Sequence, residues 1–257
     1  MGDKTKISWT DRTWNCQRGC TRVSPGCASC YMFTEQRRYG LDPTVVVKTK
    51  TWGQPRKWQR EAEKTGRQDL VFVCSWSDLF HVDGDPWRDD VWKVMGECPN
   101  LIFQVLTKRP ERIADCLPSD WGDGYANVWL GATTENQAML AARLPRLLAV
   151  PATLHFISAE PLLGPLDVLA VPMLDGDCLS RTFTHVGSGS RLDWAIVGAE
   201  SGPQRRPMEL EWLTSFAGQC KDAGIPLFVK QDGAAKAGQQ GRIHDELWSV
   251  KQIPIQR

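Results

Sequence analysis

Short apolar runs that end on a polar residue recur along most of the chain, and segments of helical periodicity lie between them. The β-rich runs cover residues 6–9, 70–77, 101–108, 128–134, 154–160, 194–200 and 226–231. Helical patterns cover 31–39, 87–97, 110–116, 135–148 and 209–223. Strands that alternate with helices predict a parallel sheet with right-handed crossovers, either a barrel or a doubly wound sheet. We expect one α/β domain over residues 1–257, since no linker or repeat divides the chain.

Polar side chains close six of these runs in succession. In parallel α/β folds, functional groups gather at the carboxyl ends of the strands. We therefore expect these side chains to line a shared polar cavity. Alternatively, they cap the strands or form ion pairs with Lys108, Arg109 or Lys230. The residues are Ser75, Ser77 and Asp78; Thr107 and Lys108; Thr133, Thr134 and Glu135; Ser158 and Glu160; Glu200 and Ser201; and Lys230, Gln231 and Asp232.

Residues 165–193 interrupt this rhythm with Gly, Ser and Pro. Loops of such length are commonly functional or mobile. We expect an irregular lid or insertion there.

The chain shows no sign of a membrane or secretory segment. No run of 18 apolar residues occurs, and the charged start MGDKTKISWTDRTW lacks an apolar signal core. We expect a cytoplasmic protein, and the oligomeric state stays open. Nine cysteines in a reducing compartment favour metal binding over a disulfide framework.

Four of those cysteines lie within fifteen positions, at Cys16, Cys20, Cys27 and Cys30. All four could wrap one zinc, although only Cys27 and Cys30 have the spacing of a zinc ligand pair. An iron–sulfur cluster fits closely spaced thiolates in a glycine-containing loop better. Ligation by Cys20, Cys27 and Cys30 would leave one iron of a four-iron cluster open, whereas Cys16 as fourth ligand would close it. Gly19 and Gly26 each precede a cysteine, so we expect their amides to turn toward sulfur.

The stretch WNCQRGCTRVSPGCASCYMF (14–33) resembles the cluster loop of radical S-adenosylmethionine (SAM) enzymes. It is most similar to the spore photoproduct lyase-like branch, whose loop has the form N-P-x-x-G-C-x3-C-x2-C-Y. The matching residues are Asn15, Gly19, Cys20, Cys27, Cys30 and Tyr31. Cys16 replaces the proline of that branch, and six residues instead of three follow Cys20. The stretch also resembles an uncharacterised phage-borne family of the form W-N-P-x-x-G-C-x6-C-x2-C-Y.

This resemblance implies a partial (β/α)6-type TIM barrel with the cluster loop, residues 15–31, after the first strand. It implies that Cys20, Cys27 and Cys30 bind a [4Fe-4S] cluster, which cleaves SAM to a 5'-deoxyadenosyl radical. An external flavodoxin- or ferredoxin-like protein would donate the electron. CSWSDLF (74–80), VLTKR (105–109) and AIVGAES (195–201) resemble strand ends of the same superfamily. The implied SAM-binding residues are Tyr31, Ser75, Ser77, Asp78, Thr107, Lys108, Thr133, Glu135, Ser158, Glu160 and Glu200, with Lys230 and Asp232 facing the substrate.

The charge distribution favours a nucleic acid or nucleotide as substrate. Residues 1–67 carry 14 Lys and Arg against 6 Asp and Glu, although residues 68–202 carry 9 against 18. The basic segment 48–67 includes Trp52 and Trp58, which are candidates for stacking on bases beside phosphate contacts. Trp76, Trp87 and Trp121 also lie in polar surroundings. The alternative is a solvated helix at 48–67 whose tryptophans face the core.

Two other classes of protein fit the cysteines. One is a nucleic-acid-binding protein that is not an enzyme and holds zinc at all four positions. The other is an iron–sulfur protein whose cluster is fully ligated by four cysteines. If SAM is used, repair of a photoproduct and modification of a base are both compatible with the sequence.

Overall fold

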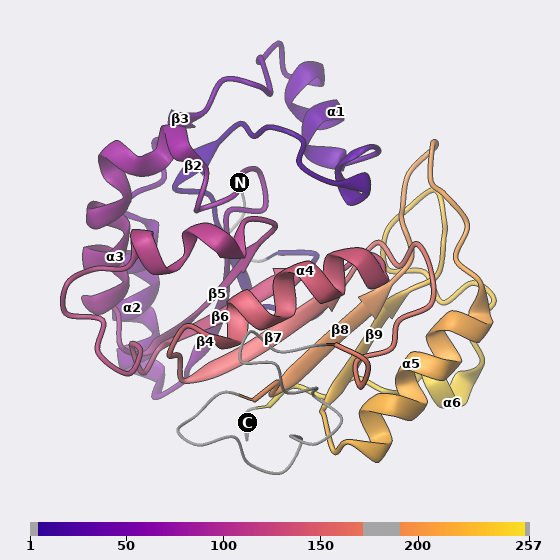
Figure 1. Cartoon of the computed structure of the whole chain (residues 1–257). Coiled ribbons are helices and arrows are strands. Elements are labelled where there is room, and N and C mark those ends of the chain that lie inside the picture. Colours follow the sequence, from indigo (N-terminus) through magenta and orange to yellow (C-terminus); the bar gives the residue numbers. More distant parts are fainter. Residues whose placement is uncertain (1–4, 172–190, 255–257) are drawn as a thin grey trace.

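Seven parallel strands form the main sheet of the computed structural model, which describes residues 5–171 and 191–254. The strands are β1 (Arg12–Trp14), β4 (Asp69–Val73), β5 (Leu101–Thr107), β6 (Val128–Thr133), β7 (Leu154–Ala159), β8 (Trp194–Gly198) and β9 (Leu227–Gln231). They follow one another across the sheet in chain order, as in a β/α barrel. β1 and β9 are the edges, so the sheet curls into an open half-barrel (Figure 1). The predicted α/β fold with a partial TIM barrel is confirmed.

Four helices lie close to the segments predicted at 31–39, 87–97, 135–148 and 209–223, one lies within 48–67, where a helix is the alternative, and a short one at 245–248 is not predicted. They are α1 (Tyr31–Arg38), α2 (Gln54–Thr65), α3 (Arg88–Gly96), α4 (Gln137–Leu148), α5 (Leu210–Asp222) and α6 (Asp245–Trp248). The helix predicted at 110–116 is instead two 3-10 turns, Pro110–Arg112 and Ala114–Cys116. Leu117 is extended because it precedes Pro118, which disfavours the α conformation and ends the segment early. None of the helices in the described part of the chain is long and apolar enough to cross a membrane.

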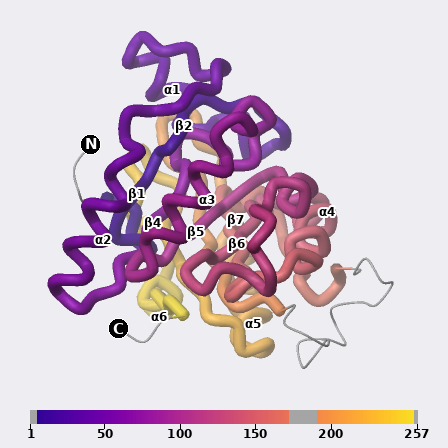
Figure 2. The backbone as a smooth tube through the Cα atoms, turned by 90° about the vertical axis from the view of Figure 1, so that its left-hand side faces the viewer, coloured from indigo at the N-terminus to yellow at the C-terminus, as the bar shows by residue number. Residues whose placement is uncertain are grey.

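A small antiparallel ribbon lies outside the main sheet. It pairs β2 (Gln17–Arg18) with β3 (Val47–Lys48). Figure 2 shows β2 between β1 and α1, beyond the carboxyl end of β1. The predicted lid at 165–193 lies for the most part outside the described residues.

The strands are buried on both faces, which explains their continuous apolar sequences. On the convex face, Val71 and Val73 of β4 belong to the main core together with helix residues such as Leu144 and Phe216. On the concave face, Leu70 and Phe72 belong to a second cluster rich in tryptophan and phenylalanine. Alternation of side chains along each strand therefore separates two cores.

Residues 6–9 do not form a strand, contrary to the prediction. They make a turn, closed by a hydrogen bond from Thr10 N to Ile7 O at 3.4 Å, and the first strand is Arg12–Trp14. Trp9 is 3% exposed and packs against Phe72 and Trp194 at ring centroid distances of 4.8 and 6.1 Å. Ile7 and Trp9 look like strand positions because they alternate, but both pack on the aromatic cluster of the concave face.

Candidate functional site

The cysteine loop, residues 15–30, begins directly after β1 and leads into α1 across the carboxyl ends of the strands (Figure 1). Tyr31 at the start of α1 donates a hydrogen bond from its hydroxyl to Ser75 O, just beyond β4, at 2.9 Å. Tyr31 is 47% exposed. The pKa of its hydroxyl is raised, chiefly by burial of that group and to a lesser extent by the charges of Cys30 and Glu160.

Cys16 is separated from the other three cysteines of the loop. It is fully buried in the main core, where its Sγ atom lies 3.4 Å from the Sγ atom of Cys74. A fourth ligand at this position would have to leave the core. The fold thus separates the Cys16 thiol from those of Cys20, Cys27 and Cys30.

The remaining three thiols are free and act on one another electrostatically. Burial raises the pKa of Cys20 to about 11; the charges of Asp78 and Cys27 add to this rise, and Arg109 opposes it. Burial also raises the pKa of Cys30, where Cys27 again adds to the rise and Lys108 opposes it. Arg109 and Lys108 thus partly counteract the effect of burial on the pKa of Cys20 and Cys30, respectively.

These thiols do not surround a single ion. In residues 5–171 and 191–254, no group of three or more His, Cys, Asp or Glu side chains could hold one metal ion. Thiolates on one tetrahedral zinc stand about 3.8 Å apart, given a Zn–S bond of about 2.3 Å. In a four-iron cluster each cysteine binds a different iron, so the ligands are spaced more widely.

The amides of Gly19 and Gly26 turn toward oxygen rather than sulfur, contrary to the prediction. Gly19 N donates to Trp76 O at 3.0 Å, and Gly26 N donates to Glu135 Oε1 at 2.9 Å. Gly19 has a φ of +90°, and a Cβ there would lie 2.2 Å from Val45 O. A Cβ on Gly26 would meet the Glu135 carboxyl at 2.9 Å. Both glycines allow the loop to approach its supports closely.

Arg109 and Asp78 hold the beginning of the loop. Arg109 Nη1 pairs with Asp78 Oδ2 at 3.0 Å, and both side chains are more than nine-tenths buried. Arg109 Nη2 also donates to Thr21 O at 3.0 Å, and Nη1 lies 3.6 Å from Cys20 Sγ. Asp78 is fixed in turn by the Thr107 hydroxyl at 2.7 Å.

Two strand-end glutamates hold the middle of the loop. Glu135, after β6, accepts from Gly26 N and pairs with Arg143 of α4 at 2.7 Å. Glu200, after β8, pairs with Arg206 at 2.6 Å, and Arg206 donates to Pro25 O at 2.9 Å. Asp78, Thr107, Glu135 and Glu200 therefore take part in the contacts that support the cysteine loop, and their binding of SAM stays a prediction.

The other predicted residues divide into two groups. Ser75 Oγ is hydrogen-bonded to the Asn15 side chain, and Ser77 Oγ donates to Gly19 O at 2.6 Å, so both brace the loop. Lys108 donates to the Thr133 hydroxyl at 3.3 Å, and Lys230 pairs with Glu160. Alternation along β5, β7 and β9 places Lys108, Ser158, Glu160 and Lys230 on the concave face, on the carboxyl side of the aromatic cluster.

Asp232 is separate from this polar group. Its carboxylate pairs with Arg242 at 2.9 Å and accepts from the backbone N atoms of Gly233 and Arg242. The structure therefore brings Lys230 to the polar end of the concave face but engages Asp232 in a local ion pair.

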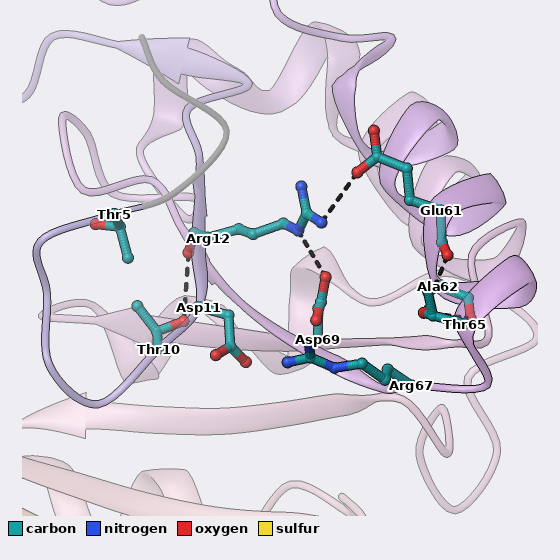
Figure 3. Close-up of a pocket in the computed structure, with 9 residues that line it drawn as sticks. All are labelled: Thr5, Thr10, Asp11, Arg12, Glu61, Ala62, Thr65, Arg67 and Asp69. Carbon is teal, nitrogen blue, oxygen red and sulfur yellow. Dashed lines mark hydrogen bonds and ion pairs between the residues drawn. The ribbon is translucent and has the colours of Figure 1, made fainter.

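A pocket of about 400 Å³ lies at the opposite, amino end of β1 and β4 (Figure 3). Arg12 bridges it, donating to Asp69 at 2.7 Å and to Glu61 at 3.0 Å. These ion pairs hold the Arg12 side chain against two of the pocket's carboxylates. In parallel α/β folds function belongs to the other edge, so we assign this pocket no function.

Comparison of the sequence with models of known protein families assigns the chain to one family. The model of a family described as "Protein of unknown function (DUF5131)" matches residues 4–250. The chain belongs to the DUF5131 family. No curated protein matches it significantly. A solved structure described as "Spore photoproduct lyase complexed with dinucleoside spore photoproduct" is similar at 12% identity and a TM-score of 0.46, over 72% of this chain and 54% of that one. The DUF5131 chain thus spans about half the length of that structure.

Sequence reasoning named Arg109 as an ion-pair partner but missed Arg143 and Arg206, which also support the cysteine loop of this DUF5131 chain. Arg143 lies among Ala and Leu in the helical pattern 135–148, which signals a buried ion pair. Arg206 lies in an irregular loop and carries no such signal. Its contact with Pro25 spans 181 positions and exists only in the folded chain.

Proposed function

We propose that this chain is a radical SAM enzyme whose [4Fe-4S] cluster is bound by Cys20, Cys27 and Cys30. The observation that carries the proposal is the separation of these three free thiols from Cys16, which lies in the core beside Cys74. Three thiolates leave one iron open to SAM. The resemblance of residues 14–33 to the radical SAM cluster loop supports the same ligand set.

The residues around the loop have distinct roles in this proposal. When bound, the cluster supplies one-electron cleavage of SAM and so the means to abstract a hydrogen atom from substrate. Lys108, Glu160 and Lys230 bind the charged and hydroxyl groups of SAM at the polar end of the concave face. Trp129 and Trp194, in the aromatic cluster below, exclude water from that side.

The proposed substrate is a nucleic acid or nucleotide, in repair of a photoproduct or modification of a base. The excess of Lys and Arg in residues 1–67 supports it, because phosphate contacts require cations. An external flavodoxin- or ferredoxin-like donor supplies the electron. Trp58 and Trp121 belong to the main core, so they do not serve as stacking platforms.

Anaerobic purification followed by a SAM-cleavage assay tests the proposal. We expect a brown protein with about four irons, and 5'-deoxyadenosine from SAM with dithionite. Cys20→Ala, Cys27→Ala and Cys30→Ala should each lose most of the iron, whereas Cys116→Ala, a buried cysteine far from the loop in sequence, should keep it. A colourless protein with one zinc, or an intact cluster that yields no 5'-deoxyadenosine, would show that the proposal is wrong.

A further inference from the structure

A second pocket, of about 310 Å³, lies at the carboxyl end of β1, where the β2–β3 ribbon leaves the sheet. It is lined by Asn15, Arg18, Val47, Lys48, Thr49, Lys50, Thr51 and Trp76. It has three cationic lining residues and no acidic one. Its volume suits one nucleotide unit and excludes a duplex.

The cations of this pocket are incompletely neutralised. Lys48 pairs with Asp90 at 3.0 Å and lies over the Trp52 ring at 3.9 Å, so it is held in place. Arg18 Nη1 is buried without a hydrogen-bond partner among the described residues, whereas Lys50 is exposed and makes no ion pair within them. An N–H group without an acceptor carries a desolvation cost, which an anionic oxygen would relieve.

The Trp76 side chain forms an aromatic wall of the pocket, and hydrogen bonds hold the Trp76 backbone in place. Trp76 O accepts from Gly19 N at 3.0 Å and from Gln36 Nε2 at 3.1 Å. Its side chain is half-buried and lies 5.9 Å from the Tyr39 ring. A positioned indole beside cations is the combination that holds single-stranded nucleic acid through base stacking and phosphate contacts.

The pocket adjoins the candidate site directly. Asn15 lines the pocket and is hydrogen-bonded to Ser75 Oγ at 3.1 Å, and Ser75 O in turn accepts the Tyr31 hydroxyl. Tyr31 follows Cys30. A nucleotide held in the pocket would therefore place its neighbour in the strand beside the cysteine loop.

We propose that this pocket binds one nucleotide of a single-stranded nucleic acid, with its phosphate on Arg18 and Lys50 and its base against Trp76. The inference rests on the proposed function for the identity of the reacting neighbour, and it names single-stranded nucleic acid as the substrate class. The binding itself requires neither SAM nor reduction of the cluster.

The test is fluorescence anisotropy of a labelled oligothymidine with the anaerobically purified full chain, at several salt concentrations. We expect Lys50→Glu to weaken binding about tenfold and to lower the slope of log K against log salt by about 0.7, the value for one phosphate contact on a single strand. The matched control is Lys221→Glu, at an exposed position on α5. It should change the affinity by no more than about twofold and leave the salt slope as in the parent chain.

The stacking contact is tested with variants that keep a large apolar side chain at position 76. Trp76→Phe should keep most of the affinity, and Trp76→Leu should lose about tenfold, since leucine has no aromatic face on which a base can stack. Circular dichroism would verify the fold. The proposal would be overturned if Lys50→Glu bound the oligothymidine as tightly as the parent chain, or if Trp76→Leu bound it as tightly as Trp76→Phe. Equal affinity of the parent chain for a single strand and for a duplex would also overturn it. Because binding is read without turnover, such a result leaves cluster content and SAM cleavage as separate measurements of the proposed function.

Discussion

Cys16 and Cys20 are separated by three residues, yet their thiols lie in different surroundings. Cys16 packs against Cys74 in the core, whereas Cys20 lies beside Arg109 on the cysteine loop. Spacing alone predicts a four-cysteine group as readily as a group of three. The structure places the Cys16 thiol in the core and the Cys20 thiol on the loop, which is the basis of the proposed group of three.

Substitution of Cys16 by alanine should therefore affect stability and not the cluster. We expect a loss of about 1 kcal/mol in the free energy of unfolding, because a small buried group is removed from the core. Urea denaturation measures this loss, and iron analysis of the same sample should give the parent content. Iron loss equal to that of Cys27→Ala in a folded protein would make Cys16 a ligand.

The Asp232–Arg242 pair makes a pH-dependent contribution to stability. Burial tends to raise the pKa of Asp232, but hydrogen bonds from Arg242 and Gly233 outweigh it and lower the pKa to about 2. A carboxyl group with a lowered pKa stabilises the fold above its ordinary pKa, and that contribution is lost as the pH falls from about 4 toward 2. Asp232→Asn should thus reduce the stability difference between pH 5 and pH 3 in urea titrations. The exposed Asp222→Asn should leave the difference unchanged.

At the scale of elements, the cysteine loop depends on supports that come from distant parts of the chain. Glu135 reaches Gly26 across 109 positions, and Arg206 reaches Pro25 across 181. Helix α2 shows the same dependence on context. Its basic sequence is compatible with a nucleic-acid contact, but Trp58 is 1% exposed and packs in the core, so the alternative of a solvated helix with a buried face is correct for this residue.

Loss of one support should loosen the loop without unfolding the sheet. Glu200→Gln removes the charge that orients Arg206, so we expect hydrogen exchange in residues 15–31 to accelerate about tenfold, as for a lost charge-assisted contact of about 1.4 kcal/mol. Exchange measured by mass spectrometry should change little in β5 and β6. Glu209→Gln, an exposed glutamate nearby in sequence, is the matched control. Parent-like exchange of the loop in Glu200→Gln would contradict its supporting role.

At the scale of the whole molecule, the half-barrel has an aromatic end and a polar end on its concave face. The N-terminal turn closes the aromatic end through Trp9, while the cysteine loop covers the carboxyl ends of the strands. The polar side chains of the concave face therefore lie at one edge of the sheet, beside the cysteine loop. The pocket at the other edge is crossed by ion pairs of Arg12.

Removal of the Trp9 side chain should destabilise the entire fold. Trp9→Ala deletes a side chain that is 3% exposed and packed between Phe72 and Trp194, so we expect a loss of about 3–5 kcal/mol. Trp212→Ala, at a half-buried position on α5, should cost clearly less. Urea denaturation followed by circular dichroism would compare the two. Equal losses would show that Trp9 does not close the concave face.

The sequence by itself determined the α/β class, because apolar strands and amphipathic helices are local patterns with periods of two and 3.6 residues. It also determined the cysteine spacing and the polar strand ends. Only the tertiary structure decided that residues 6–9 close the concave face, that Cys16 lies in the core, and that Asp78, Glu135 and Glu200 support the loop. The physical reason is that a buried carboxylate must be paired, and the partner that pairs it is set by proximity across the fold rather than by position along the chain.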